Sequence, residues 1–347
     1  MEKRVIFNNP IRIQQMSKRN RNLMTRIMDI DNLRLAYKNT SKNKKYTFGY
    51  LEFREYDQWN LYQIQDELET GQYKIGPYRK FVIYEPKARE ISALGFKDRL
   101  IQHALCNVIG PIFDKTLLPN TFACRKGMGT HAALMKIKEY LKDPTQNFTH
   151  FLKTDFSKYF ASIDHDVLWP MIEKKIHCRA TLALIEEIIP RNQVGIPIGS
   201  LTSQLMANVY ASEVDYLIHH TLKRRHWVRY MDDIVILGDD PEELRDIFNK
   251  IQEFSNNVLK LKISKWQVSP LKNGINFVGY RSWKTHTLIR KDSVKRAKHK
   301  IKTLNTSSDL DKFWASWDGH TMWADCNHLT QTLRKLKCKN KSIPAMT

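Results

Sequence analysis

Ten consecutive residues decide the fold: Arg229-Tyr230-Met231-Asp232-Asp233-Ile234-Val235-Ile236-Leu237-Gly238. The Ile-Val-Ile-Leu run is typical of a buried strand, and the two carboxylates before it mark the turn of a β-hairpin. Two adjacent aspartates at the tip of a buried hairpin repel each other, so we expect a divalent metal ion to neutralise them. A third carboxylate is then needed from elsewhere in the chain.

Residues 151–160 offer that carboxylate, because a strand-like run ends at Asp155 and a helix-compatible segment follows it. Asp155, Asp232 and Asp233 together predict a carboxylate triad that holds two Mg²⁺ ions, with Mn²⁺ able to replace them. Such a pair of ions is the clamp for in-line phosphoryl transfer from a nucleoside triphosphate. The alternative is an acidic surface turn together with an aspartate that caps a helix.

The charge of the chain predicts a polyanionic partner. Lys and Arg number 57 against 36 Asp and Glu, which gives a net charge of +21, and the basic residues recur from end to end. A membrane surface or an acidic protein could also use this field. Eight Trp and fourteen Tyr interleaved with the basic residues favour nucleic acid, where rings stack on bases.

The five cysteines show no C-x-x-C spacing, which predicts reduced thiols in a cytosolic compartment. The pairs His103/Cys106 and His177/Cys178 resemble metal-ligand spacings, but we expect them in the core. No apolar stretch reaches the length of a membrane span, and the N-terminus lacks the apolar core of a signal peptide. We therefore expect no membrane association and a cytoplasmic protein.

The first third of the chain predicts helices followed by a basic hairpin. Residues 1–22 are polar and basic, either an arm that touches RNA or a solvated terminus. Helical spacing follows, including a helix over about 57–70 that ends at Gly71. A strand is predicted over 80–86, and residues 87–92 are predicted to form a turn into a second strand. Arg89 is placed to bind a triphosphate, since a guanidinium binds phosphate oxygens bidentately.

Two further helices carry candidate contacts. A helix over 96–105 presents Lys97, Arg99 and Gln102, which are either its solvated face or contacts to template. Two glycines and Thr130 open the next helix, which suits close approach to a phosphate chain. After Asp155, a helix is expected to begin with Asp164 or Ser162 as its cap, and Asp164 and Asp166 are assigned to capping and not to metal binding.

The last part of the chain predicts more strands and a basic helical region. A Gly/Pro loop turns into a helix over 195–208, whose small residues allow a close approach by another molecule. Strands are predicted over 259–265 and 273–280. The run 293–302 carries five Lys or Arg, which predicts a helix that follows nucleic-acid phosphates. Trp314, Trp317 and Trp323 are expected in the core.

The YMDD turn, preceded about seventy-five residues upstream by the D-x-x-x-x-F block that begins at Asp155, resembles the palm of a reverse transcriptase. The order R-x-I then D-R-x-x-Q, formed by Arg89, Ile91, Asp98, Arg99 and Gln102, is similar to group II intron and retroelement enzymes. The resemblance implies an α+β right-hand polymerase fold with fingers, palm and helical thumb. We expect a basic arm over 1–22, fingers with the first part of the palm over 23–150, the catalytic palm over 151–282 and the thumb over 283–347.

Two positions discriminate among polymerases. Phe160 stands five residues after Asp155, where a bulky ring would exclude a ribose hydroxyl, which favours DNA synthesis. Ile198 stands where high-fidelity enzymes carry Gln, so the site loses a polar contact that helps to discriminate nucleotides. The pattern Ile198-Gly199-x-x-x-Ser203-Gln204 with YMDD resembles reverse transcriptases of diversity-generating retroelements, above all phage-encoded members, over roughly residues 17 to 330.

That resemblance implies a bacterial host cell, with the protein encoded by the bacterium or a phage. It also implies an RNA template copied with errors at adenines, and cDNA that replaces a variable repeat. It also implies a partner, a small basic helical accessory protein that forms a pentameric barrel. The nucleotide would contact Arg89, Phe156, Phe160, Ile198, Gly199, Gln204 and Lys265, the last resembling a general-acid lysine near the pyrophosphate. Template and primer would contact Lys97, Arg99, Gln102, Tyr230, Met231, Phe277, Gly279, Tyr280, Lys295 and Arg296.

Two alternatives remain open at this point. One is a group II intron, retron-like or phage-defence reverse transcriptase without targeted mutagenesis. The other is a nucleic-acid-binding protein with an inactive palm, which the intact aspartates disfavour.

Overall fold

Apolar residues gather into two separately packed units in the computed structural model, which describes residues 22–84, 88–304 and 306–339 and side chains as far as residue 335. The first unit comprises residues up to 113 together with 168–193 and 200–202. The second comprises 114–167, 194–199 and the chain from 203 onward. The residues of the predicted carboxylate triad all belong to the second unit.

Helices make up most of the first unit. In α4 the apolar residues Leu61, Ile64 and Leu68 recur at helical spacing and are buried, and the helix ends before Gly71, which has a φ of +70°. This confirms the helix predicted over 57–70. The helices described here are α1 (Leu23–Met28), α2 (Ile30–Thr40), α3 (Phe48–Glu55), α4 (Asp57–Glu69), α5 (Phe96–Asp114), α8 (His165–Glu173) and α9 (Arg179–Ile188), of which α5 ends and α8 begins in the second unit.

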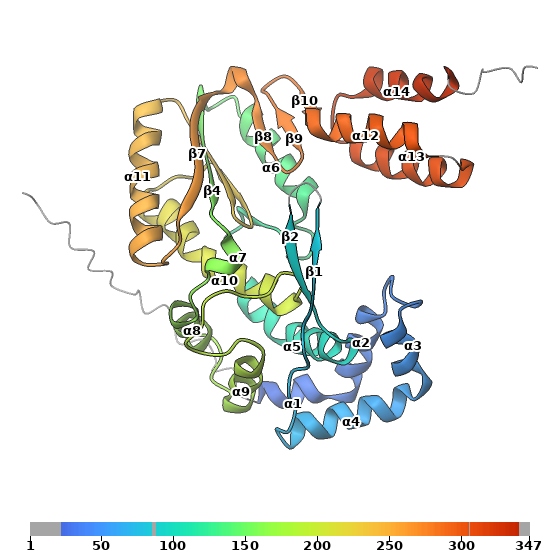
Figure 1. The fold of residues 1–347 in the computed structure, drawn as a ribbon. Coiled ribbons are helices and arrows are strands. Elements are labelled where there is room, and N and C mark those ends of the chain that lie inside the picture. Colours follow the sequence, from blue (N-terminus) through green and yellow to red (C-terminus); the bar gives the residue numbers. More distant parts are fainter. Residues whose placement is uncertain (1–21, 85–87, 305, 340–347) are drawn as a thin grey trace, which may run out of the picture. The chain divides into compact units, whose positions relative to one another are not determined.

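A two-stranded antiparallel hairpin belongs to the same unit and confirms the predicted pair of strands (Figure 1). It consists of β1 (Arg79–Ile83) and β2 (Arg89–Ala93), in which Ile83 lies opposite Arg89. All of β1 is exposed, and so is Arg89. The predicted strand ends at residues 85 and 86 fall outside the described residues.

A five-stranded sheet forms the centre of the second unit. Its order is β3-β5-β6-β4-β7, with β3 and β5 parallel and the other neighbours antiparallel. The strands are β3 (Thr121–Phe122), β4 (His150–Phe156), β5 (Trp227–Tyr230), β6 (Asp233–Gly238) and β7 (Ile263–Pro270). The hairpin predicted over 229–238 is thus confirmed as β5 and β6. The strand predicted to begin at residue 259 begins instead at Ile263, because Leu259 and Leu261 are buried in the connection that precedes it.

Helices cover both faces of this sheet, which explains why β6 is an almost unbroken apolar run. Helix α11 (Pro241–Asn257) lies against β4, β6 and β7 (Figure 1). On the other side, α6 (Thr130–Lys142) packs its apolar residues against β5 and β6 in one buried cluster. A Cβ on Gly238 would lie 3.0 Å from Leu244 of α11, so the glycine permits this close approach.

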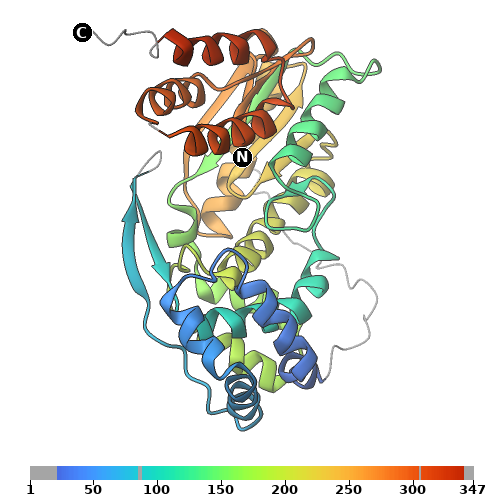
Figure 2. The same ribbon diagram turned by 90° about the vertical axis from the view of Figure 1, so that its right-hand side faces the viewer.

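The chain ends in a small sheet and three helices, which pack together in both views (Figure 2). Antiparallel β8 (Ile275–Phe277), β9 (Tyr280–Ser282) and β10 (Thr287–Ile289) precede α12 (Lys291–Thr303), α13 (Ser307–Thr321) and α14 (Asn327–Lys339). Trp317 is buried in their core and Trp314 and Trp323 pack against it, as predicted. The basic helix predicted over 293–302 is α12.

Two further helices contribute to the second unit, and the second of them begins in the first unit. Helix α7 (Tyr159–Ser162) follows β4, and α10 (Leu201–Tyr216) continues into a π-helical turn over Leu217–Thr221. Asp164 Oδ1 accepts the backbone N–H groups of Asp166 and Val167 at 3.0 and 3.2 Å, which confirms its predicted capping role. None of the helices within the described ranges is long and apolar enough to cross a membrane.

Candidate active site

The catalytic candidates lie in one row across three strands. Asp155 of β4 is the direct partner of Asp233 in β6 on one side and of Lys265 in β7 on the other. Residues directly opposite each other in a sheet point to the same face. The sheet therefore presents two carboxylates and one ammonium group side by side, from segments that are far apart in the sequence.

The turn between β5 and β6 brings Asp232 beside this row. Tyr230 pairs with Asp233 across the hairpin, and Met231 between them has a φ of +58°, the left-handed region that side chains rarely adopt. Arg229 donates from Nη1 to the carbonyl oxygen of Met231 at 2.8 Å. The unusual backbone conformation is thus fixed by a hydrogen bond from a buried side chain.

Arg229 belongs to a buried polar network. Its Nε and Nη2 donate to the two carboxylate oxygens of Asp215, each at 2.7 Å, and neither side chain is exposed to solvent. Thr121 Oγ1 donates to Asp215 at 2.6 Å, and Asn208 Oδ1 accepts from Arg229 at 3.2 Å. Strand β3, helix α10 and the hairpin are therefore tied together beneath the turn.

The environment of Asp233 favours the binding of a cation. Burial raises the pKa of Asp233 to about 6, and the neighbouring carboxylates Asp155 and Asp232 raise it as well, while Lys153 lowers it. Its Oδ1 is buried and has no hydrogen-bond partner among the described residues. A buried carboxylate oxygen without a partner is costly, so the donor set fits a divalent metal ion.

The carboxylates of the three aspartates nonetheless do not converge on one metal-binding position. Across the part of the chain that the structure describes, no group of three or more His, Cys, Asp or Glu side chains is arranged to hold a metal ion. Lys153 Nζ lies 2.9 Å from Asp233 Oδ2 and also donates to the carbonyl oxygen of Asn276 at 2.5 Å. An ammonium group thus occupies one carboxylate oxygen of the predicted triad.

The loop that precedes α10 is anchored beside Phe160. The backbone N–H of Ile196 donates to the carbonyl oxygen of Phe160 at 2.8 Å, and Gly195 donates to Ile163 at 2.8 Å. Gly195 has a φ of +93°, and a Cβ there would lie 3.1 Å from the carbonyl oxygen of Ala161. The half-buried Phe160 and Ile198 are therefore held in one local structure, with Gly199 exposed at φ +111°.

Several residues predicted to contact nucleotide or primer are buried. Phe156 is 3% exposed and stacks on Tyr159 at a ring distance of 5.5 Å, so only its backbone is left for a ligand. Phe277 and Tyr280 are buried as well, and Tyr280 donates to the carbonyl oxygen of His320 at 2.9 Å. The turn between them presents backbone instead, with Val278 and Gly279 both at positive φ.

The remaining candidates of the second unit are more accessible. Tyr230, Met231 and Gln204 are half-buried, and Gln204 Oε1 lies 3.3 Å from Cys124 Sγ. Lys295 and Arg296 are exposed on α12, and Lys265 is exposed on β7. Their charged groups are free to reach a polyanion.

Four candidates belong to the first unit, so the structure does not place them relative to the aspartates. Arg89 is exposed, and Lys97 pairs with Glu67 at 2.6 Å. Burial lowers the pKa of Arg99. Gln102 is buried, and its Oε1 accepts from Ser200 Oγ at 2.8 Å, so its side chain is engaged inside the protein.

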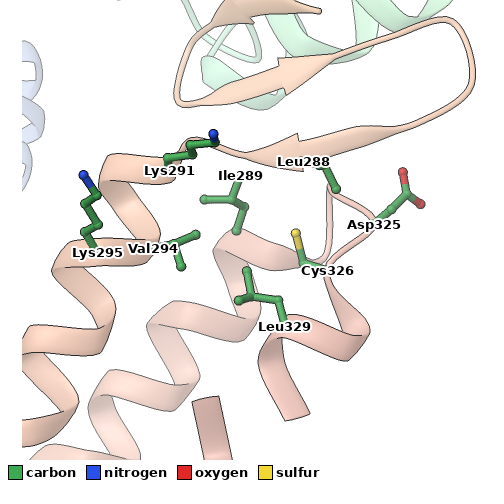
Figure 3. A pocket seen from close by; sticks show the side chains of 8 residues that line it. All are labelled: Leu288, Ile289, Lys291, Val294, Lys295, Asp325, Cys326 and Leu329. Atoms are coloured by element: carbon green, nitrogen blue, oxygen red, sulfur yellow. The ribbon is translucent and has the colours of Figure 1, made fainter. Parts of the chain in front are cut away.

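A cavity of about 400 Å³ opens in the C-terminal helical region (Figure 3). Apolar side chains form most of its wall, and two lysines and one aspartate lie at its edge. The lining residues are Leu288, Ile289, Lys291, Val294, Lys295, Asp325, Cys326 and Leu329. It lies apart from the row of aspartates in the sequence, and none of the predicted site residues except Lys295 lines it.

Similarity to known proteins identifies the family. The sequence pattern of the family described as reverse transcriptase (RNA-dependent DNA polymerase) matches residues 80–282, more than half of the chain. The chain belongs to the reverse transcriptase family. The match contains β4 and the β5–β6 hairpin, and therefore the whole row of aspartates.

Relatives of this reverse transcriptase include intron-encoded proteins. Protein YkfC of Escherichia coli is 23% identical over 280 residues, covering 66% of this chain and 71% of YkfC. The group II intron-encoded protein LtrA of Lactococcus lactis is 25% identical over 244 residues, covering 66% of this chain and 39% of LtrA. A COX1/OXI3 intron 1 protein of Saccharomyces cerevisiae is 26% identical over 213 residues, covering 56% of this chain and 25% of the yeast protein.

The chain thus spans a quarter to about two fifths of the yeast protein and LtrA. Among solved structures, telomerase from Candida albicans with a fragment of telomeric RNA gives a TM-score of 0.48 at 11% identity, covering 67% of this chain and 51% of that one.

Sequence reasoning missed the buried Arg229–Asp215 network and the contacts of Lys153. A signal for the first exists, because Asp215 stands among apolar residues of α10, and an acid on the buried stripe of a helix requires a buried partner. The contacts of Lys153 leave no comparable trace, since the sequence does not record which distant residues a lysine in the middle of a strand will meet.

Proposed function

We propose that this reverse transcriptase is an RNA-directed DNA polymerase that adds deoxynucleotides to a primer 3′-hydroxyl with release of pyrophosphate. The observation that carries the proposal is the register of the sheet, in which Asp155 lies directly opposite Asp233 with Asp232 in the adjoining turn. A carboxylate pair on neighbouring strands, in a chain of this family, is the arrangement that phosphoryl transfer with two metal ions needs.

Asp155, Asp232 and Asp233 would hold Mg²⁺, and the buried, unpartnered Oδ1 of Asp233 supports this assignment. Bound Mg²⁺ would lower the pKa of the primer hydroxyl and offset the charge that develops on the leaving pyrophosphate. The protein would contribute the backbone positions of the three aspartates, through the strand pairing and the hydrogen bond from Arg229 to Met231.

Other residues of the chain would position the nucleotide. Phe160 would pack against C2′ of the incoming sugar and exclude a ribose, which restricts synthesis to DNA. Lys265, in the same row as Asp155, would donate a proton toward the pyrophosphate. Arg89, which is exposed on β2, would bind the triphosphate, since a guanidinium binds phosphate oxygens bidentately.

The finer proposal is that the enzyme makes error-prone cDNA, mutagenic at template adenines, in a diversity-generating retroelement. Its support is the pattern Ile198-Gly199-x-x-x-Ser203-Gln204 with YMDD, in which Ile198 lacks the hydrogen-bonding groups of a glutamine. A template RNA, a primer and a basic pentameric helical accessory protein would be its partners in the cytoplasm of a bacterial cell.

A second candidate is a group II intron or retron-like polymerase without targeted mutagenesis. The observation that favours it is the likeness to intron-encoded proteins such as LtrA. Such an enzyme shares the aspartates and the sugar-excluding ring, so the two candidates differ in the errors that they make.

Sequencing of cDNA decides between them. The purified protein would copy a primed RNA of mixed composition with Mg²⁺ and dNTPs, with and without a basic pentameric accessory protein. Errors confined largely to template adenines support the diversity-generating proposal, and faithful copying supports the intron-like candidate. Absence of copying under every condition would leave only a nucleic-acid-binding protein.

A further inference from the structure

We propose that Lys153 is a positioning residue with two roles. Its ammonium group supplies the positive charge at Asp233 that a divalent cation would otherwise supply, and it links that carboxylate to the backbone just before the turn at residues 277–280. The inference deepens the proposed function and rests on it, since it assumes that Asp233 binds metal and that the turn meets the primer terminus. It assigns a role to a residue that the sequence did not single out.

The geometry of Lys153 joins two separate sheets. It lies two residues before Asp155 on β4, and alternate residues of a strand share a face, so its side chain points to the side of the aspartates. Its Nζ donates to Asp233 Oδ2 at 2.9 Å and to the carbonyl oxygen of Asn276, in β8, at 2.5 Å. One ammonium group thus links the five-stranded sheet to the three-stranded sheet.

The environment makes this ammonium group a substitute for a metal ion. The side chains of Lys153 and Asp233 are only 22% and 26% exposed, and Asp155 and Asp232 add negative charge beside Asp233. A carboxylate in that position needs a positive partner. Lys153 supplies it as long as no cation is bound.

A divalent cation that binds both oxygens of Asp233, Oδ2 as well as the unpartnered Oδ1, would have to displace the ammonium group from Oδ2. Lys153 would then keep its hydrogen bond to the Asn276 carbonyl and its place 5.9 Å from the centre of the Phe277 ring. Metal binding at the carboxylate would in this way release the turn at 277–280 from Asp233. The arrangement couples the metal state of the site to the strand that precedes the primer turn.

The first test compares thermal unfolding in EDTA and in Mn²⁺ at pH 8.5 for the wild type, Lys153→Met, Lys153→Arg and Lys250→Met. Methionine keeps the length of the side chain and removes its charge. Lys250 is the matched control, because it pairs with Asp246 on the exposed face of α11. The Mn²⁺ concentration at half of the full stabilisation is read from a titration of each protein.

We expect Lys153→Met to be less stable than the wild type in EDTA and to gain more stability from Mn²⁺. It should reach half of the full stabilisation at an Mn²⁺ concentration about tenfold lower, because a charge-assisted hydrogen bond no longer competes with the cation. Lys153→Arg and Lys250→Met should respond as the wild type does. Equal Mn²⁺ gains in Lys153→Met and the wild type would reduce Lys153 to a packing residue and overturn the proposal, as would weaker Mn²⁺ binding by Lys153→Met.

The second test separates KM for the primed RNA from kcat. With the link to Asn276 gone, Lys153→Met should raise KM for the primed template several-fold while Lys250→Met leaves it unchanged. An unchanged KM for the primed template would overturn the proposal that Lys153 positions the turn at residues 277–280. A wild-type protein that binds Mn²⁺ as predicted but copies no RNA would instead contradict the proposed function and leave the role of Lys153 at the carboxylate intact.

Discussion

Arg229 and Asp215 form a doubly hydrogen-bonded ion pair beneath the turn that carries Asp232, with both side chains fully buried. The pair lies 14 residues apart in the chain, on β5 and α10. Because the same guanidinium donates to the carbonyl oxygen of Met231, the pair fixes the left-handed residue of the turn. The buried charge of Arg229 thereby helps to fix the turn that carries Asp232.

Replacing Arg229 by Lys should destabilise the protein strongly. Lysine cannot make both bonds to Asp215 and reach Met231 as well, so a buried charge loses partners, at a cost of about 3–5 kcal/mol in the free energy of unfolding. Urea unfolding of wild type and variant measures the difference. Arg245→Lys is the control, since its pair with Glu242 is exposed and should be worth less than about 1 kcal/mol. Equal losses in the two variants would refute the special position of Arg229.

The double variant Arg229→Met with Asp215→Leu separates stability from positioning. Two apolar side chains of similar volume remove both buried charges together, so much of the lost stability should return. The carbonyl oxygen of Met231 still lacks its donor, and synthesis should stay slow. A double variant that is both stable and as active as the wild type would show that the turn holds its shape without Arg229.

Replacing Phe160 by Val should relax the choice of sugar. The smaller side chain leaves space beside C2′, so ribonucleotides should be incorporated far more readily relative to deoxynucleotides. Competition between rNTPs and dNTPs in primer extension measures the ratio. Phe156→Leu is the control, because that ring is buried against Tyr159, and its loss should lower stability without changing the ratio. If the ratio of ribonucleotide to deoxynucleotide incorporation changed only in Phe156→Leu, Phe160 would not be the residue that excludes the ribose.

Replacing Ile198 by Gln should make the enzyme more accurate. Glutamine restores a side chain that can hydrogen-bond next to the nascent base pair, and discrimination rests on such contacts. The error frequency at template adenines, measured by sequencing cDNA, should fall, whereas errors at other template bases should change little. An unchanged adenine error frequency would remove Ile198 from the explanation of mutagenesis.

The Asp164 carboxylate predicts a loss of stability in acid. Burial opposes its ionisation, but the bond from Lys260 at 2.7 Å and two backbone N–H groups prevail and lower the pKa of Asp164. A depressed folded-state pKa stabilises the fold above the unfolded pKa of about 4 and loses that contribution as the pH falls through the folded value.

Asp164→Asn should therefore be less stable than the wild type near neutral pH, and the difference should shrink as the pH falls below about 4. Urea midpoints at several pH values measure it. A difference that stays constant into acid would mean that the ionised form of Asp164 contributes nothing beyond what an amide supplies.

Local patterns carried the prediction of the elements near the site. The hairpin at residues 229–238, the strand that ends near Asp155 and the helix that opens at Thr130 all follow from short-range signals, apolar alternation and turn residues. The direct pairing of Asp155 with Asp233 was not predicted, because the triad hypothesis does not specify which strands are neighbours.

Contacts across long stretches of sequence could not be predicted in the same way. Phe277, Tyr280 and Gln102 were assigned to ligands by resemblance, yet each is buried among partners that are distant in the chain. Lys153 meets Asn276 across 123 positions, which no periodicity records. The division into fingers, palm and thumb at residues 150 and 282 stays a prediction, since the two packed units are divided differently.

The most direct test of the central claim is primer extension on an RNA template by the wild type and by Asp232→Asn, with circular dichroism and thermal unfolding of both proteins. We expect cDNA from the wild type with Mg²⁺ and none from a variant that is as well folded. Equal extension by the folded Asp232→Asn protein would contradict the account, because synthesis would then not depend on the carboxylates of the hairpin.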